Sequence, residues 1–346
     1  MKRSMRWWPL RRSLVAAAGA MLLLSLAACA GGGSNASSGG ADKVVWYTTF
    51  ASDDVHPMVA AFNKKYPDIQ VEALRLSADK IPQRVLTEQR GGKYNADVIS
   101  GESVYVSQLV SAQALMPYNA PQEAPLPTSL DLPDGYRTVI YANTTVIAYN
   151  PAALKAHHLK PPTSWQDLTK PEWKGRFSID PGAVNFYQSM IASMGHDDAL
   201  KLIQALGANS PRLVESHTLA LTQVQAGEPL ATATAYGYKA AKLKRKTPDR
   251  VEFVNTKPLP TSLTLIDLAK KAPHEKAAKV FLDWMESKEG QKAVVDVTNH
   301  VSLRDDVGND PTVWDPSKWP PAWVGPASPS QYNTLVSEYK EALHAS

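Results

Sequence analysis

The sequence contains a single cysteine, Cys29, among its 346 residues. It therefore cannot form an intramolecular disulfide, and it has no further thiol for a cysteine-ligated zinc site or for a thiol nucleophile. A chain of this length can fold without such cross-links, because it is long enough to bury a large apolar core.

The sequence also lacks the short motifs that mark common catalytic sites. It has no G-x-S-x-G nucleophile elbow, no phosphate-binding G-x-x-x-x-G-K-[ST] loop and no H-E-x-x-H metal motif. Its eight histidines are scattered along the chain. We therefore expect a protein that is not an enzyme and that carries no cofactor.

Excess basic charge is confined to the N-terminus. Five of the 37 lysines and arginines precede Cys29, whereas none of the 33 acidic residues does. The rest of the chain is close to neutral, which argues against a nucleic-acid-binding domain. One local basic cluster is interpreted as the solvated face of a helix: Lys239, Lys242, Lys244, Arg245 and Lys246.

Residues 1–28 have the pattern of an export signal. A basic head precedes an apolar run from Leu14 to Ala28, which is too short to cross a membrane as a mature helix. The run ends in Leu26-Ala27-Ala28-Cys29, which resembles the lipobox of bacterial lipoproteins. That resemblance implies cleavage before Cys29 and lipidation of its thiol. Arg11-Arg12 leaves both Sec and Tat export open.

A flexible tether is expected at residues 29–42, because its glycines and serines offer nothing apolar to bury. About ten such residues span roughly 15–20 Å root-mean-square. We therefore expect a folded body in the periplasm or cell envelope, anchored to a membrane by lipid on Cys29 without spanning it.

Strands and helices are predicted to alternate at the start of the body. The β-rich runs are 44–48, 69–74 and 96–99, and the helical patterns are 53–66, 81–90 and a segment through Tyr105 and Leu109. This order predicts an α/β fold with a mainly parallel sheet covered by helices.

Two long strand-like runs, 140–149 and 262–268, flank a second α/β region. A chain that leaves one lobe, builds a second and returns shows this pattern, and two crossings create a hinged cleft. We expect one lobe from 43–145 and 263–300, and the other from 146–262 and 301–346. Helix N-termini and strand ends at such a cleft are a usual place for small ligands.

Motifs in a fixed order carry a family resemblance. They are Val44–Thr49, Ala61–Pro67, Ala96–Ile99, Val146–Pro151, Trp165–Leu168, Pro171–Arg176, Ala226–Pro229, Ala272–Ala278 and Ser287–Gln291. Together, residues 43–304 resemble the solute-binding proteins of bacterial ABC importers, and within them the ferric-ion-binding branch. Relatives in this branch also bind phosphonates, sugar phosphates, thiamine or polyamines. The resemblance implies a two-lobed periplasmic-binding-protein clamshell that delivers a solute to a membrane permease and its ATPase.

The resemblance also implies a candidate ferric site. Ferric-ion binders hold the metal with tyrosine phenolates from the second lobe and with a carboxylate and a histidine from the first. Glu102 matches the carboxylate, and Tyr236 and Tyr238 fall near the tyrosine pair. Two departures are that Gly237 separates the tyrosines and that residues 49–52 contain no histidine. Fe³⁺ would be the transported ligand, and its hardness suits oxygen donors.

A small anion, such as an organophosphonate or a sugar phosphate, is the alternative ligand. Hydroxyls and backbone N–H groups at strand ends and helix starts suit a phosphate. The candidates are Thr48, Thr49, Ser100, Gly101 and Ser103 from the first lobe, and His217 and Thr218 from the second.

We expect a monomer whose partners are the solute, the permease complex and the lipid anchor, with no nucleic acid. Two other classes stay open at this point. An exported enzyme would show an organised nucleophile or metal triad, and a structural or adhesion lipoprotein would lack a cleft between its lobes.

The lipid anchor generates the first prediction. Cys29→Ala removes the thiol that would carry the lipid, so mature protein should leave the membrane fraction for the soluble fraction. Fractionation followed by immunoblotting measures this, with the unaltered chain as control. A variant that is processed and still sediments with membranes would contradict the lipoprotein assignment.

Overall fold

The computed structural model describes residues 42–122, 126, 130, 132–136, 138–325 and 327–345. All of them belong to one compact unit, Gly40–Ser346. The predicted signal peptide, Cys29 and nearly all of the tether lie outside the described residues. Within the part of the chain that is described, no helix is long and apolar enough to cross a membrane.

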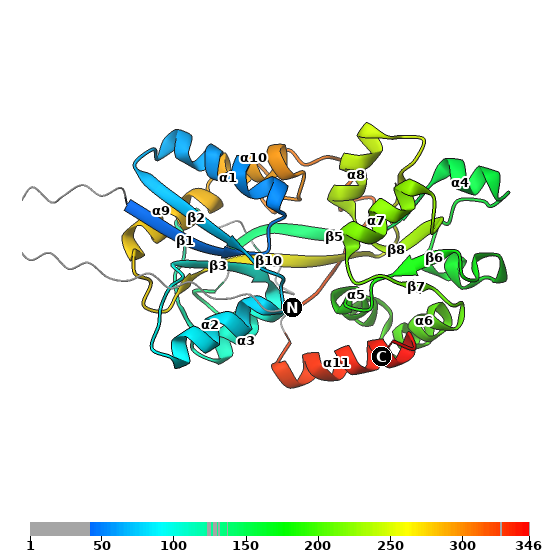
Figure 1. Cartoon of the computed structure of the whole chain (residues 1–346), viewed down its shortest axis with the longest axis horizontal. Coiled ribbons are helices and arrows are strands. Elements are labelled where there is room, and N and C mark those ends of the chain that lie inside the picture. Colours follow the sequence, from blue (N-terminus) through cyan, green and yellow to red (C-terminus); the bar gives the residue numbers. More distant parts are fainter. Residues whose placement is uncertain are drawn as a thin grey trace, which may run out of the picture. The chain divides into compact units, whose positions relative to one another are not determined.

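The first part of the fold confirms the predicted alternation of strands and helices. Its elements are β1 (Asp42–Thr48), α1 (Ser52–Lys65), β2 (Ile69–Arg75), α2 (Lys80–Arg90), β3 (Val98–Glu102) and α3 (Ser103–Ser111). Strand β1 pairs in parallel with β2 and with β3. Figure 1 shows these strands between α1 on one side and α2 and α3 on the other.

Strand β3 differs from the prediction in its bounds. It runs from Val98 to Glu102, whereas the buried hydrophobic run indicated 96–99. Ser100 and Gly101 therefore lie inside a strand and not at a helix start. The reason is a non-local partner: Ser100 pairs with Ile266 and Gly101 pairs with Leu265 of the antiparallel strand β10.

Two strands of eleven residues each, β5 (Val139–Tyr149) and β10 (Leu259–Ala269), form the centre of the sheet. They pair antiparallel, with Thr261 opposite Thr144. Strand β10 also pairs with β3 and with the short β4 (Leu115–Met116), and β5 also pairs with β8 and β9. The predicted long strands are thus confirmed, and each extends slightly beyond its predicted bounds.

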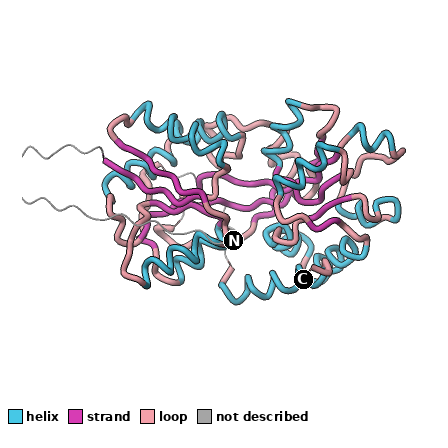
Figure 2. Tube along the Cα trace, in the orientation of Figure 1, coloured by secondary structure: helices cyan, strands magenta, loops and turns pink. Residues whose placement is uncertain are grey.

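The second part of the fold is built between these two strands. Its elements are α4 (Pro151–Ala156), η1 (Trp165–Thr169), η2 (Pro171–Trp173), β6 (Phe177–Ile179), α5 (Val184–Met194), α6 (His196–Ala208), β7 (Arg212–Leu213), α7 (His217–Ala226), β8 (Ala231–Tyr236), α8 (Gly237–Lys246) and β9 (Glu252–Val254). Strand β6 pairs in parallel with β7 and β8, and β8 and β9 are antiparallel to β5. Figure 2 shows the helices around these strands.

The C-terminal segment returns to both parts. Its elements are α9 (Glu275–Glu286), α10 (Lys288–Ala293), the π-helical turn η3 (Val294–Thr298), β11 (Pro321–Trp323) and α11 (Pro329–Ala342). Helix α9 packs against β1 and β10 in an aromatic core that includes Trp46, Phe62 and Phe281. Helix α11 contacts α5 and α6, where Tyr339 is buried in the core of the second part.

A close approach between α6 and the end of α11 fixes one glycine. A Cβ atom at Gly207 would lie 2.3 Å from the carbonyl oxygen of Ala342. Any side chain at position 207 would therefore push the C-terminal helix off the core.

This approach generates the second prediction. Gly207→Ala should lower the free energy of unfolding by about 1–3 kcal/mol, the usual cost of overpacking. Urea unfolding followed by circular dichroism measures it. Gly308→Ala is the matched control, because a Cβ there meets no atom within 4 Å. Equal stability of the two variants would contradict the proposed role of the contact.

Candidate functional site

Glu102 lies where the two parts of the fold meet. It is the last residue of β3 and the N-cap of α3. Its Oε1 accepts a hydrogen bond from the Tyr236 hydroxyl at 3.2 Å, and its Oε2 accepts one from the Asn185 amide. Strand β8 delivers Tyr236 and helix α5 delivers Asn185, so one carboxylate from the first part binds two side chains of the second.

Burial dominates the electrostatics of this contact. It raises the pKa of Glu102, and the nearby His217 and the two hydrogen bonds only partly offset this effect. The pKa of Tyr236 is raised well above its usual range by burial and by the charge of Glu102. The phenol therefore keeps its proton at neutral pH and donates a hydrogen bond to the carboxylate.

A second carboxylate, Asp180, lies close by at the end of β6. Its Oδ1 accepts a hydrogen bond from the backbone N–H of Gly182, and its Oδ2 lies 3.8 Å from Nε2 of His217. The His217 ring packs on Tyr236, with ring centroids 4.1 Å apart. Its Nδ1 donates to the carbonyl of Thr234, which fixes the orientation of the imidazole.

Four aromatic side chains, of which Tyr236 is the first, form a stack. The ring centroids of Tyr236 and Tyr238 are 5.9 Å apart, those of Tyr238 and His300 are 3.7 Å apart, and those of His300 and Tyr141 are 3.8 Å apart. The two predicted tyrosines therefore lie side by side, although α8 begins at the glycine between them. Sequence reasoning missed His300, which is distant from them along the chain.

Gly237 separates the tyrosines for a packing reason. A Cβ atom at this position would lie 2.3 Å from Oγ1 of Thr144 on β5. The start of α8 thus rests directly on the central strand, and a side chain at 237 would require the Thr144 side chain to shift.

Two of the predicted hydroxyls of the first lobe, those of Thr48 and Ser100, have internal partners. Thr48 Oγ1 accepts hydrogen bonds from Ser100 Oγ at 2.9 Å and from the backbone of Phe50, and Ser100 Oγ accepts one from Trp46. Thr48, Ser100, Gly101 and Ser103 are all buried, whereas Thr49 is half-buried. A contact of these residues with a solute stays a prediction.

The predicted residues of α7 differ in their surroundings. His217 and Thr218 begin that helix, as the sequence indicates. Thr218 is exposed, and its hydroxyl accepts a 2.6 Å hydrogen bond from Nζ of Lys239. No ion pair of Lys239 is found among the described residues.

The basic cluster on α8 is only partly the solvated face that its composition indicates. Lys242 forms an ion pair at 3.3 Å with Asp54, a buried residue of α1 in the first part. Lys244 pairs with Glu252, and Arg245 pairs with Asp310. None of the five basic residues is buried, and the buried face of α8 is formed by other residues, among them Tyr238, Ala240 and Ala241.

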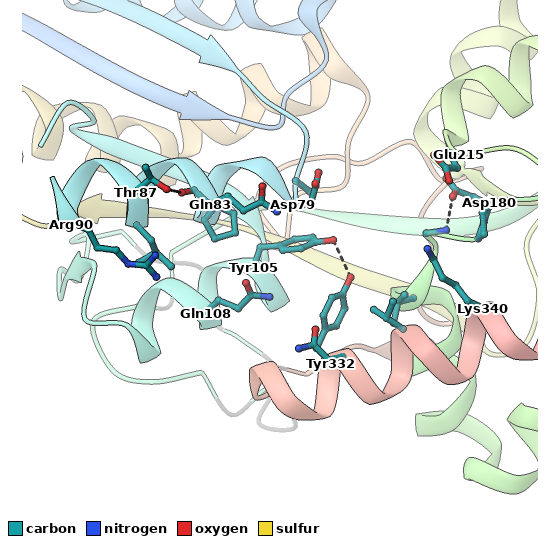
Figure 3. A pocket seen from close by; sticks show the side chains of 18 residues that line it. Asp79, Gln83, Thr87, Arg90, Tyr105, Gln108, Asp180, Glu215, Tyr332 and Lys340 are labelled. Atoms are coloured by element: carbon teal, nitrogen blue, oxygen red, sulfur yellow. Dashed lines mark hydrogen bonds between the residues drawn. The ribbon is translucent and has the colours of Figure 1, made fainter. Parts of the chain in front are cut away.

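A cleft of about 940 Å³ opens beside Asp180. Figure 3 shows Tyr105 on α3 and Tyr332 on α11 meeting across it, and their hydroxyls are 3.0 Å apart. Its other polar lining includes Asp79, Gln108, Glu215 and Lys340. This size is typical of pockets for small molecules.

The sequence signal differs among Asp180 and Tyr332, which line the cleft, and Asn185, which binds Glu102. Asp180 directly follows a strand, which is a position that the strand-end rule identifies. Asn185 and Tyr332 lie inside helices, and no local pattern marks them.

No group of three or more histidine, cysteine, aspartate or glutamate side chains that could hold a metal ion occurs in the described part of the chain. The candidate ferric set of Glu102, Tyr236 and Tyr238 is of another kind, since two of its three members are phenols.

Comparison with protein families identifies the chain. The sequence model described as "Bacterial extracellular solute-binding protein" matches residues 57–321, which is most of its length. The chain belongs to this family. Helix α11 of this solute-binding protein lies beyond the matched region.

Individual relatives of this solute-binding protein share modest identity with it. The Fe(3+)-binding periplasmic protein of Serratia marcescens is 27% identical over 222 residues, which are 59% of this chain and 62% of that protein. The match thus spans less than two thirds of the length of that relative.

Solved structures share its fold. Iron-bound HitA from Pseudomonas aeruginosa has a TM-score of 0.73 at 22% identity, covering 87% of this chain and 99% of that one. The periplasmic binding protein AfuA from Actinobacillus pleuropneumoniae, with fructose-6-phosphate bound, has a TM-score of 0.72 at 20% identity, covering 87% and 96%. The predicted periplasmic-binding-protein fold is therefore confirmed.

The buried carboxylate generates the third prediction. Above the raised folded-state pKa of Glu102, the group is charged in both states and the folded protein bears the cost of its desolvation. As pH falls through that pKa, Glu102 becomes protonated in the folded protein while it is still charged in the unfolded chain. The cost of its desolvation therefore decreases, and it is gone once pH falls below the lower pKa of the unfolded state. Glu102→Gln should therefore raise the Tm of the ligand-free solute-binding protein at pH 8 by a few degrees.

Thermal unfolding measured from pH 8 to pH 4 tests this, and the difference from the unaltered protein should shrink as pH falls. Glu215→Gln is the control, because Glu215 is exposed. A destabilised Glu102→Gln variant at pH 8 would show that the hydrogen bonds of the carboxylate outweigh its desolvation.

Proposed function

We propose that this protein is the solute receptor of an ABC importer and that its solute is ferric iron, free or chelated. It binds and does not catalyse. A permease and its ATPase are its membrane partners, and a lipid on Cys29 holds a periplasmic monomer at the membrane.

The observation that carries the choice of solute is the charge of the site. Two carboxylates, Glu102 and Asp180, gather near the Tyr236 phenol, and burial raises the pKa of both. Among the described residues neither carboxylate forms an ion pair with a lysine or an arginine, and Nε2 of His217 lies 3.8 Å from Asp180. Buried negative charge without a counter-charge favours a cationic solute, and oxygen donors suit a hard cation such as Fe³⁺.

The similar proteins support this choice. One relative carries the name Fe(3+)-binding periplasmic protein, and one structural neighbour holds iron. Hinged closure fits the predicted lobes, 43–145 with 263–300 and 146–262 with 301–346. Glu102 from the first and Tyr236 from the second, which are hydrogen-bonded to each other in this structure, would then both contact the ion.

An anionic solute is the second candidate, and Lys239 favours it. This half-buried lysine contacts Thr218, and AfuA, a neighbour of the same fold, holds a sugar phosphate. Thr49, Thr218 and Lys239 would then supply the contacts. The two buried carboxylates oppose a phosphate at the centre of the site, so we place this candidate second.

Ferric iron generates the fourth prediction. Fe³⁺ must displace the proton of Tyr236, so its affinity should rise by about tenfold per pH unit for each proton released. Phenolate-to-metal charge transfer should give the loaded protein a broad visible band. Tyr236→Phe should bleach or shift that band and weaken binding by about tenfold or more, because only the oxygen is lost.

Titration with ferric citrate, followed by absorbance and calorimetry between pH 6 and pH 8, measures both effects. Tyr66→Phe is the control, because this tyrosine caps α1 away from the cleft. A colourless protein that binds a sugar phosphate or phosphonate by calorimetry would replace iron with the anionic solute.

A further inference from the structure

The C-terminal helix α11 contacts both parts of the fold. It packs along α5 and α6 of the second part, and its N-terminal end also contacts α3 of the first part. Figure 1 shows α11 running from the region of α3 to the region of α6 on one side of the central strands. The matched family region ends at residue 321, so this helix is a feature of the chain outside it.

Two tyrosines and a glutamate fix the C-terminal half of α11 to the second part. Tyr339 is fully buried, and its hydroxyl donates a hydrogen bond of 3.2 Å to the backbone carbonyl oxygen of Asp180. Glu338 accepts a 2.7 Å hydrogen bond from the Tyr187 hydroxyl of α5, and it lies 2.9 Å from Nε2 of His196 in α6. The helix is therefore held by the second part, to which the candidate site residue Asp180 also belongs.

The N-terminal end of α11 reaches the first part through one pair of phenols. The Tyr332 hydroxyl lies 3.0 Å from the Tyr105 hydroxyl of α3, and the two rings meet edge to face with centroids 5.6 Å apart. Tyr332 is only 8% exposed, and the adjacent Val104 of α3 is fully buried in the same apolar core as Tyr332. A specific polar contact, beside a shared apolar core, thus joins α11 to α3.

This phenol pair spans the cleft. Both tyrosines line it, together with Gln83 and Gln108 of the first part and Lys340 of α11. A hinge motion about β5 and β10 that opened the cleft would move α3 away from α11, because α11 is held by the second part. The two hydroxyls would then separate, and the loss of their hydrogen bond adds a free-energy cost to opening.

We propose that Tyr105 and Tyr332 determine how tightly this protein retains its solute, because α11 is a strap that holds the two lobes together over the cleft. The inference rests on the proposed function for the presence of a solute between the lobes, but not for the identity of that solute. The strap raises the population of the closed form. The apparent affinity of a clamshell is its intrinsic affinity multiplied by that population.

A merely structural role of the pair makes a different prediction. If the phenols only pack α11 onto the fold, the loss of a hydroxyl lowers thermal stability and leaves the distance between the lobes unchanged. Tyr105→Phe and Tyr332→Phe each keep the ring and remove one hydroxyl of the pair. Tyr187→Phe is the matched control, because it removes a phenol hydroxyl that contacts α11 from within the second part.

The experiment uses the full chain with Cys29→Ala, which also removes the only native thiol. Nitroxide labels at Lys93→Cys and Lys201→Cys report the distance between the lobes by pulsed electron paramagnetic resonance. Both positions are exposed, one beyond α2 and the other on α6. Without added solute, Tyr105→Phe and Tyr332→Phe should shift the distances to longer values, and Tyr187→Phe should not. Ferric citrate, used as the probe, should dissociate about threefold to tenfold faster from both variants, the loss expected for one hydrogen bond.

The double variant Tyr105→Phe/Tyr332→Phe tests whether the two hydroxyls act as a pair. It should change the distances no more than either single variant, because the same contact is lost in all three. Unchanged distances in the single variants, or additive shifts in the double variant, overturn the strap.

The outcomes also separate the strap from the proposed function. If ferric citrate does not bind to the unaltered chain, iron as the solute is overturned, and the distances measured without solute still decide the role of the pair. If one single variant fails to fold, which its circular dichroism spectrum reveals, the other removes the same contact and decides.

Discussion

The antiparallel pairing of β5 with β10 is the constraint on which the rest of the structure depends. All of β10 is buried, and so is all of β5 except its last residue. Strand β10 carries β3 on its other side, and β5 carries β8. The strand that ends in Glu102 and the strand that ends in Tyr236 are therefore held by neighbouring strands of one sheet, which sets the distance between the two side chains.

That placement partly buries Glu102 without giving it an ion-pair partner among the described residues. Its hydrogen bonds come from a phenol and an amide, which satisfy the oxygens but leave the charge uncompensated. Asp180 adds a second carboxylate at short range. This uncompensated charge is electrostatically unfavourable, and under the proposed function a bound cation would relieve it.

Much of the fold could be predicted from the sequence, because its signals are local. Hydrophobic periodicity and β-rich runs located β1, α1, β2 and α2 to within about two residues. The extension of β3 to Glu102 could not be predicted in this way, since it depends on pairing with a strand more than 160 residues away.

The same distinction holds for the candidate site. Glu102, Tyr236 and His217 follow or begin regular elements, where a family motif or the strand-end rule identifies them. Asn185 and His300 gain their meaning only from neighbours that are distant in sequence: Glu102 for Asn185, and the rings of Tyr141 and Tyr238 for His300. No local pattern marks such residues.

The contact between Gly237 and Thr144 also constrains how this protein can evolve. A chain with adjacent tyrosines at positions 236 and 237 would place a side chain where Thr144 Oγ1 now lies. That substitution requires the Thr144 side chain to rotate, to be replaced by a smaller one, or to move with β5. The effect of a mutation at 237 therefore depends on the residue at 144. This dependence couples the two positions, and it favours the separated arrangement of the tyrosines.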